Sequence, residues 1–266
     1  MKWGISIMML CFFLEAAGQS EPIEKQWEKM DSVFISNLTK AYEANPLNVE
    51  HLLSYKENKK ENLGFDYYLV SGSTGKGYVS IFYEFIYYKN KLVSYRLEPQ
   101  MPHDERLTKT YKKLYASLVK INDNQKAEPI YYGLEDMTKP LVGFNTKVNV
   151  NQSILFFMTP YSGIMYGYYG GFGDDLIDNR RNYLSIKNQI TPKVCELLLY
   201  SKNPATRLSA IEFYYKNPKL FINQKKRLED RIALIFSELP VILTMSVDQE
   251  ITKNARDLVN RFVKKL

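Results

Sequence analysis

Residues 1–18 have the three-part pattern of a cleavable secretory leader, and this feature constrains the rest of the chain more than any other. Lys2 gives a short positive start, and Gly4 to Leu14 is an uninterrupted apolar run. Ala16 and Gly18 supply the two small residues that a signal peptidase requires. The apolar run is too short to span a bilayer permanently. We therefore expect cleavage before Gln19 and export, so that the mature protein is secreted or periplasmic.

After cleavage the chain keeps a single cysteine. Cys11 lies inside the apolar run and leaves with the leader, while Cys195 remains. No intrachain disulfide can then form, although disulfides often stabilise exported proteins. A chain of 266 residues is long enough to be held together by a hydrophobic core instead. No transmembrane segment is predicted in the mature chain, because the most apolar stretch, 232–245, is interrupted by Glu238 and Pro240.

The first part of the mature chain has helical periodicity. Between Glu21 and Asn45, apolar residues recur every three or four positions, which predicts a helix with one apolar face. Asn45-Pro46 ends this helix, and a shorter helix is predicted from Asn48 to about Lys59. The residues of the apolar face are Ile23, Trp27, Met30, Phe34, Leu38 and Ala41.

The periodicity then changes to that of strands. Residues 65–71, 78–88 and 92–98 are predicted to form three strands. The connections 72–77 and 89–91 have the composition of hairpin turns. Together these segments predict an antiparallel meander with one buried face.

Helical patterns dominate the remainder of the sequence. A helix is predicted from Asp104 to about Ile121, followed by short strands at 129–135 and 148–158. After Ser185 the pattern is helical throughout. The predicted helices there are 192–202, 204–217, 219–239 and 249–266.

The predicted fold class is α+β. It has N-terminal helices and a central antiparallel β-meander with a packed helix, followed by an all-helical C-terminal sub-domain. The expected domains are residues 1–18 as a signal peptide, 19–185 as the α+β domain and 186–266 as the helical sub-domain.

Two stretches of the helical tail have similar outlines. Asn203 to Ile211 looks like the turn and second helix of one unit, and Asp248 to Ile251, ending at Ala255, looks like another. Aligning Ala210 with Ala255 gives a period of 45 residues (255 − 210), inside the range of about 40–47 found in HEAT and armadillo repeats. About the last 75 residues thus resemble a pair of such repeats. The resemblance implies a protein-interaction scaffold that has no chemistry of its own.

Charge and histidine content argue against several functions. The formal net charge is +7, but Lys and Arg form no compact run, so no nucleic-acid partner is predicted. The two histidines, His51 and His103, have no metal-ligand spacing to another candidate ligand. The glycine-rich stretch 71–77 lacks the final Ser or Thr of a phosphate-binding loop. We therefore predict no metal site and no cofactor.

The Gly/Tyr-rich stretch 161–173 is the candidate binding site. Its glycines allow a ligand to approach the backbone closely, and exposed tyrosines stack on sugars or apolar groups. One alternative is an irregular linker whose rings are buried. Another is that the aspartates begin a helix, with Asp174 as its N-cap. The candidate binding residues are Tyr166, Tyr168, Tyr169, Phe172, Asp174 and Asp175.

The predicted helix 104–121 also has a basic stripe on the side opposite its apolar face. This stripe either meets an anionic partner or is the solvated back of a docked helix. Its residues are Arg106, Lys109, Lys112, Lys113 and Lys120.

From these patterns we expect an exported, non-catalytic binding or interaction module. Its partner would be another envelope or extracellular protein, or a glycan. The alternative is a carboxylate-dependent hydrolase that acts on a saccharide or a peptide, because acid and base catalysis needs only two well-placed Asp or Glu residues.

Overall fold

The computed structural model describes residues 21–53, 58–102, 104–124, 126–171, 173 and 175–264. The predicted α+β class is confirmed, because helices, a five-stranded antiparallel sheet and a mainly helical C-terminal region are all present. The predicted leader lies outside the described residues. In the described part of the chain, no helix combines the length and the apolar character that crossing a membrane requires.

The chain divides into two compact units. Unit 1 contains Met1–Leu53, Ser73–Phe82 and Glu98–Glu128. Unit 2 contains Ser54–Gly72, Tyr83–Leu97 and Pro129–Leu266. The chain therefore passes between the units repeatedly. The predicted domain boundary at residue 185 does not coincide with these divisions and stays a prediction.

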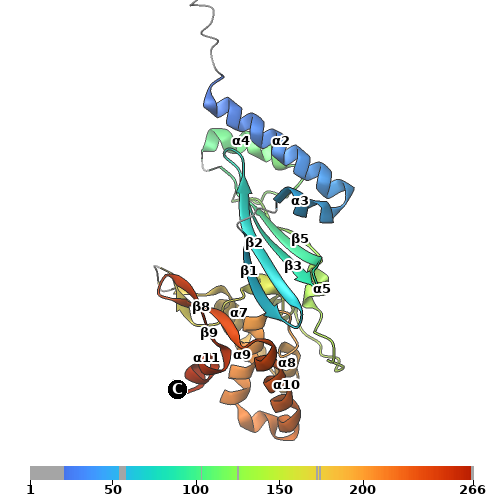
Figure 1. Ribbon diagram of the computed structural model, residues 1–266, viewed down its shortest axis with the longest axis vertical. Coiled ribbons are helices and arrows are strands. Elements are labelled where there is room, and N and C mark those ends of the chain that lie inside the picture. The colour runs from blue at the N-terminus through green and yellow to red at the C-terminus, as the bar shows by residue number, and fades with distance from the viewer. Residues whose placement is uncertain are drawn as a thin grey trace, which may run out of the picture. The chain divides into compact units, whose positions relative to one another are not determined.

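The α-helices and strands can be followed in Figure 1. The helices are α2 (Ile23–Ala44), α3 (Val49–Leu53), α4 (Glu105–Tyr115), α5 (Leu134–Thr138), α6 (Gln152–Phe157), α7 (Asp178–Ile186), α8 (Pro192–Leu198), α9 (Pro204–Lys216), α10 (Lys225–Glu238) and α11 (Ala255–Lys264). The strands are β1 (Lys59–Gly64), β2 (Tyr67–Gly75), β3 (Ser80–Tyr88), β4 (Lys91–Pro99), β5 (Ile130–Tyr132), β6 (Tyr169–Gly170), β7 (Asp175–Leu176), β8 (Val241–Ser246) and β9 (Gln249–Asn254). Short 3₁₀ helices occupy Pro46–Asn48, Pro160–Ser162, Lys187–Gln189 and Pro218–Gln224.

The main sheet has the strand order β1-β2-β3-β4-β5, and two tight turns connect its neighbours. Phe65 and Asp66, between β1 and β2, have φ angles of 55° and 65°. Lys89 and Asn90, between β3 and β4, have φ angles of 48° and 63°. Positive φ at both central residues is typical of type I′ turns, whose twist matches that of paired strands. The predicted turn at 89–91 is therefore confirmed.

The helix expected from Asn48 to Lys59 is only partly present. A 3₁₀ turn ends at Asn48, and α3 follows it and ends at Leu53. Lys59 already begins the edge strand β1. Polar residues fill β1, so its sequence lacks the alternating apolar signal on which the strand prediction depends.

The first apolar stripe divides into two parts, both in unit 1. Phe34 and Leu38 are buried, as expected, and α2 lies alongside α4 (Figure 1). By contrast, Ile23, Trp27 and Met30 are 60%, 39% and 47% exposed. The predicted apolar face is therefore buried at Phe34 and Leu38 but largely exposed in the first half of α2.

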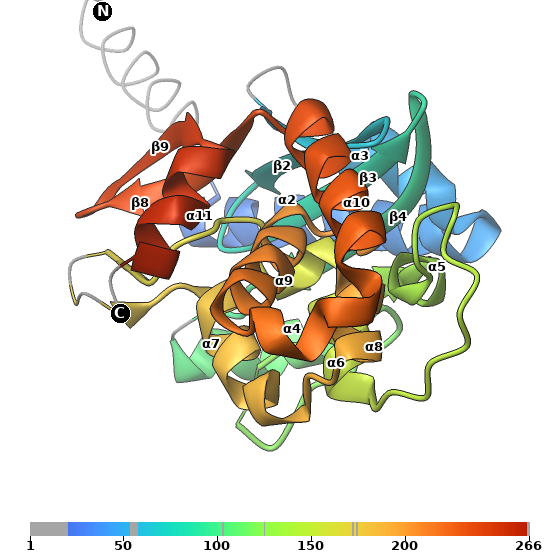
Figure 2. The same cartoon turned by 90° about the horizontal axis from the view of Figure 1, so that it is seen from below.

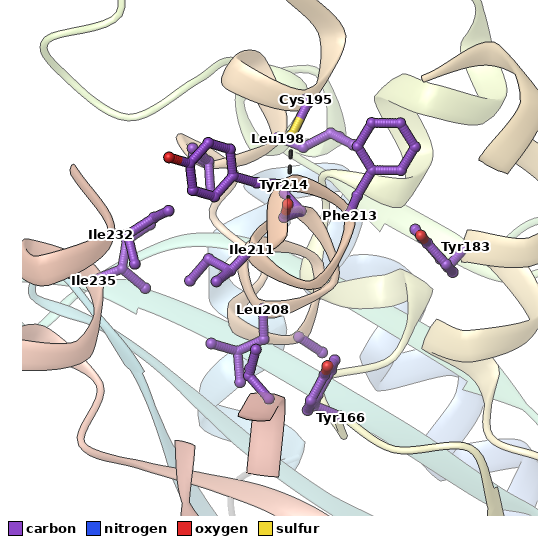
Figure 3. Close-up of a cluster of buried hydrophobic side chains, with 14 of the residues drawn as sticks. Tyr166, Tyr183, Cys195, Leu198, Leu208, Ile211, Phe213, Tyr214, Ile232 and Ile235 are labelled. Atoms are coloured by element: carbon purple, nitrogen blue, oxygen red, sulfur yellow. Dashed lines mark hydrogen bonds between the residues drawn. The ribbon is translucent and has the colours of Figure 1, made fainter. Parts of the chain in front are cut away.

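In unit 2 the core is built around α9. Every residue from Pro204 to Tyr214 is buried, and α8 and α11 pack against this helix (Figure 2). Side chains of α8 and α10, such as Leu198 and Ile232, lie in the same cluster (Figure 3). Cys195 approaches α9 so closely that its thiol donates a hydrogen bond to the carbonyl oxygen of Ala210 at 3.4 Å (Figure 3). Burial raises the pKa of the Cys195 thiol, so this cysteine is a small packed residue and not a reactive one.

Two local predictions are wrong. Residues 148–158, expected as a strand, contain α6, because the Asn151 side chain accepts a hydrogen bond from the Ile154 amide and starts a helix. Residues 241–254 form the hairpin β8-β9, so the helix expected from Gln249 begins only at Ala255. The short apolar run at 154–158 fits a helix and a strand equally well, which explains the first error. The likeness to helical repeats stays a prediction.

The packing around α9 predicts the cost of a cavity there. Replacing Leu208, which is fully buried, by Ala should lower the free energy of unfolding by about 2–5 kcal/mol. Leu234→Ala is the matched control, because Leu234 lies on α10 and is 46% exposed. Urea denaturation followed by circular dichroism measures both. Equal effects of the two substitutions would contradict this description of the core.

Candidate functional site

The Gly/Tyr-rich stretch forms a small hairpin in unit 2. Tyr169 on β6 pairs with Leu176 on β7, and Gly170 pairs with Asp175. Tyr169 and Asp175 are exposed, Tyr168 is half-buried and Tyr166 is fully buried. Phe172 and Asp174 lie outside the described residues. The structure thus places the predicted site residues on one hairpin but gives them different surroundings, and their binding role stays a prediction.

A buried ion pair lies beneath this hairpin. Arg180 on α7 and Glu212 on α9 are each 1% exposed. The guanidinium donates from Nη1 to Oε1 at 3.2 Å and from Nη2 to Oε2 at 2.7 Å. Arg180 Nε donates to the carbonyl oxygen of Gly167 at 2.8 Å. Such a two-point pair is geometrically specific as well as strong, and here it connects two helices to the hairpin.

Further donors fill the carboxylate of Glu212. The Tyr166 hydroxyl donates to Oε2 at 2.7 Å, and Lys216 Nζ donates to Oε1 at 2.8 Å. The Tyr168 ring lies 3.9 Å from the Arg180 guanidinium carbon. Burial alone would raise the pKa of Glu212, but the hydrogen bonds and positive charge of Arg180 outweigh it and hold this pKa below its usual value. Glu212 is therefore an ionised structural group, not an available general acid.

Two further buried cations, Arg207 and Arg231, lie near the carboxyl end of α8. Arg207 Nη1 donates to the carbonyl oxygen of Ser201 at 2.8 Å, and Nη2 contacts that of Leu63. Arg231 donates to the carbonyl oxygen of Leu199 at 3.2 Å. The last carbonyls of a helix carry partial negative charge and lack partners within the helix. Arg231 binds such a carbonyl at the C-cap residue Leu199, and Arg207 binds carbonyls of the following loop and of β1, so the role of both arginines is structural.

Unit 1 contains a groove of about 780 Å³, which is within the range of ligand sites. Three separate stretches of the sequence line it, which is why sequence analysis did not find it. The lining residues are Glu24, Glu28, Tyr78, Ser80, Phe82, Gln100, Met101, Pro102, Asp104, Arg106, Leu107 and Thr110.

The groove is locally acidic in a chain whose net charge is +7. Asp104, the N-cap of α4, forms an ion pair with Arg106 at 2.8 Å, and the hydrogen bonds from Arg106 lower the pKa of Asp104 to about 2. Glu24 and Glu28 lie one turn apart on α2. Within the described residues, neither forms an ion pair. The groove therefore presents two carboxylates that form no ion pair among the described residues, although Arg106, which also lines it, interacts electrostatically with Glu24.

Tyr78 is held firmly at the wall of this groove. Its amide donates a hydrogen bond to Oδ2 of the buried Asp31 at 2.7 Å, and its ring meets Trp27 edge-on at 5.2 Å. Gly77 permits this approach, because a Cβ there would lie 2.8 Å from Asp31 Oδ2. Burial, followed by the charges of Glu24 and Glu28, raises the pKa of the Tyr78 hydroxyl. The phenol therefore stays neutral and can stack or donate a hydrogen bond.

Residues of the predicted basic stripe line two adjoining cavities of unit 1, which share Gln100, Met101 and Pro102. Arg106 lines the acidic groove but is paired with Asp104. Lys109 and Lys112 instead line a second cavity of unit 1, of about 850 Å³, together with Lys126. Comparison with protein-family models, with curated proteins and with solved structures finds no match for the chain.

The ion pair in unit 2 makes a mutational prediction. Glu212→Gln leaves the buried Arg180 without its counter-charge and should cost about 3–5 kcal/mol of stability. Glu229→Gln, which removes an exposed partner of Lys225, should cost less than about 1 kcal/mol. Urea denaturation at neutral pH measures both variants. A loss for Glu212→Gln no larger than for the control would show that the pair contributes little.

The same pair predicts a pH dependence. The folded pKa of Glu212 lies below the ordinary value of 4.5, so the unfolded chain binds the proton first as pH falls. The stabilisation is then fully present above that value and is lost as pH falls through the folded pKa. The stability difference between the wild type and Glu212→Gln should therefore shrink in acid, and denaturation curves at several pH values test this. A difference that stays constant in acid would contradict it.

Proposed function

We propose that the protein is an exported, non-catalytic interaction module whose unit 1 groove binds a positively charged group of a partner protein. The observation that carries this proposal is the pair of carboxylates without an ion-pair partner among the described residues, Glu24 and Glu28, beside the fixed ring of Tyr78. The export rests on the leader pattern of residues 1–18.

The energetics of α2 favour a cationic ligand. Two like charges four residues apart destabilise a helix by about 0.2–0.5 kcal/mol. An ammonium or guanidinium group between Glu24 and Glu28 offsets that repulsion. Such a cation is also attracted to the faces of aromatic rings, which Tyr78 and Phe82 supply. A groove with both carboxylates and aromatic rings is therefore suited to bind a lysine or arginine side chain.

The charges of the groove favour binding over hydrolysis. A carboxylate hydrolase needs one acid whose pKa is raised so that it carries a proton at neutral pH. Asp104, which faces the groove from α4, has its pKa lowered to about 2 by Arg106 instead. Glu212, the buried carboxylate beneath the Tyr hairpin, is held ionised by Arg180.

A direct test uses tetralysine as the probe and Trp27 as the reporter. Trp3 leaves with the leader, so Trp27 is the only tryptophan of the predicted mature chain. Tetralysine should change its fluorescence in a saturable way, and tetraglutamate should not. Glu24→Gln combined with Glu28→Gln should weaken tetralysine binding about fivefold or more, because each lost pair is worth roughly 0.5–1 kcal/mol.

The control removes two exposed charges from elsewhere in unit 1, by Glu43→Gln combined with Glu128→Gln. This variant should bind tetralysine as the wild type does. Equal weakening by both double variants, or equal binding of tetraglutamate, would refute a specific cation site.

Processing is tested separately. N-terminal sequencing of the protein purified from its host should begin at Gln19, and cell fractionation should find it outside the cytoplasm. A chain that still begins at Met1 in the cytoplasm would contradict the proposed export.

A further inference from the structure

The first half of α2 carries an apolar strip that the described chain covers only in part. Ile23, Trp27, Met30 and Phe34 follow one another at spacings of three and four residues, so they share one side of the helix. Phe34 is 8% exposed, but the three residues before it are open to solvent. We call Ile23, Trp27 and Met30 the α2 strip. It extends over about two turns of helix, or roughly 11 Å.

The α2 strip borders the acidic groove directly. Glu24 and Glu28, which line the groove, lie between and beside the strip residues on the same turns of α2. Trp27 belongs to the strip, and its ring contacts Tyr78, which lines the groove. All of these residues lie in unit 1. An apolar surface and an anionic surface therefore form one continuous area.

We infer that the partner segment is an amphipathic helix with a basic flank, which lays its apolar face along the α2 strip and places Lys or Arg side chains against Glu24 and Glu28. The inference rests on the proposed function of the groove and names the kind of partner that the groove takes. Charge complementarity selects the basic flank, because the carboxylates beside the strip form no ion pair among the described residues, and Arg106, the cation that lines the groove, is paired with Asp104.

The geometry of α2 favours a helix over a strand as the occupant. The backbone groups of α2 are hydrogen-bonded within the helix, so an extended peptide would find no edge to pair with. Side-chain packing remains, and a helix offers residues at the same spacings of three and four.

Two other occupants fit less well. A second copy of the chain, docked symmetrically, would bring the same patch against itself and place Glu24 and Glu28 beside their own copies. Like charges at an interface are unfavourable. An anionic membrane surface meets the same repulsion. Binding of either occupant at the α2 strip would therefore overturn the inference.

The test compares three synthetic peptides with the mature chain, residues 19–266. One contains leucine and lysine with all leucines on one helical face, the second has the same composition in scrambled order, and the third has glutamate in place of lysine. Fluorescence anisotropy of labelled peptides measures the affinities. The amphipathic basic peptide should bind about tenfold more tightly than either of the others, which corresponds to about 1.4 kcal/mol.

Variants separate this inference from the proposed function. Ile23→Ser combined with Met30→Ser should weaken the amphipathic basic peptide about tenfold and leave tetralysine binding unchanged. Both positions are exposed, so the variant should fold, which circular dichroism verifies. The matched control is Leu220→Ser combined with Ile222→Ser, which removes two apolar residues that are 52% and 74% exposed in unit 2.

Each result decides between the two proposals. If the strip variant binds the amphipathic basic peptide like the wild type while Glu24→Gln/Glu28→Gln still weakens tetralysine, the groove stands and the helical partner is overturned. Equal affinity for the ordered and scrambled peptides overturns it too. Self-association of the mature chain that the strip variant abolishes would replace it with a second copy, and strip-dependent binding to anionic phospholipid vesicles would replace it with a membrane.

Discussion

Unit 2 depends on the buried ion pair between Arg180 and Glu212. Its two charges lie in the centre of the unit, where an unpaired charge costs several kcal/mol. The pair joins α7 to α9, and the Gly167 carbonyl and the Tyr166 hydroxyl attach the Tyr hairpin to both. The packing of the hairpin, and hence the burial of Tyr166, follows from this one contact. The exposed residues of the hairpin are Tyr169 and Asp175.

Asp31 has the corresponding role in unit 1. One of its oxygens accepts hydrogen bonds from the Tyr78 amide at 2.7 Å and from the Tyr111 hydroxyl at 2.5 Å, so a single carboxylate connects α2, the β2-β3 connection and α4. The groove is a product of this connection, because α2 and α4 supply its charged residues. Its acidity thus arises from two helix faces that the buried aspartate brings together.

Sequence patterns within a few residues correctly predicted some helix starts and turns, because these depend on neighbouring residues. The helix from Pro204 begins as expected, with Asn203 accepting hydrogen bonds from the amides of the first turn, and the turn at Lys89 also follows from its sequence. Long-range features were not predictable. Glu212 lies 32 residues from Arg180, and α9 is buried on all sides, so no polar face marks its charged residues as a pair. The predicted apolar periodicity of α2 is correct, but periodicity does not reveal which residues of an apolar face are packed against other elements and which are exposed.

The division of the chain into interleaved segments has a consequence for its evolution and engineering. Each unit is assembled from three separate stretches, and β2, β3 and β4 each contribute residues to both. Neither unit can be cut out as one continuous piece of gene, so recombination cannot transfer the groove to another protein without the strands that carry it.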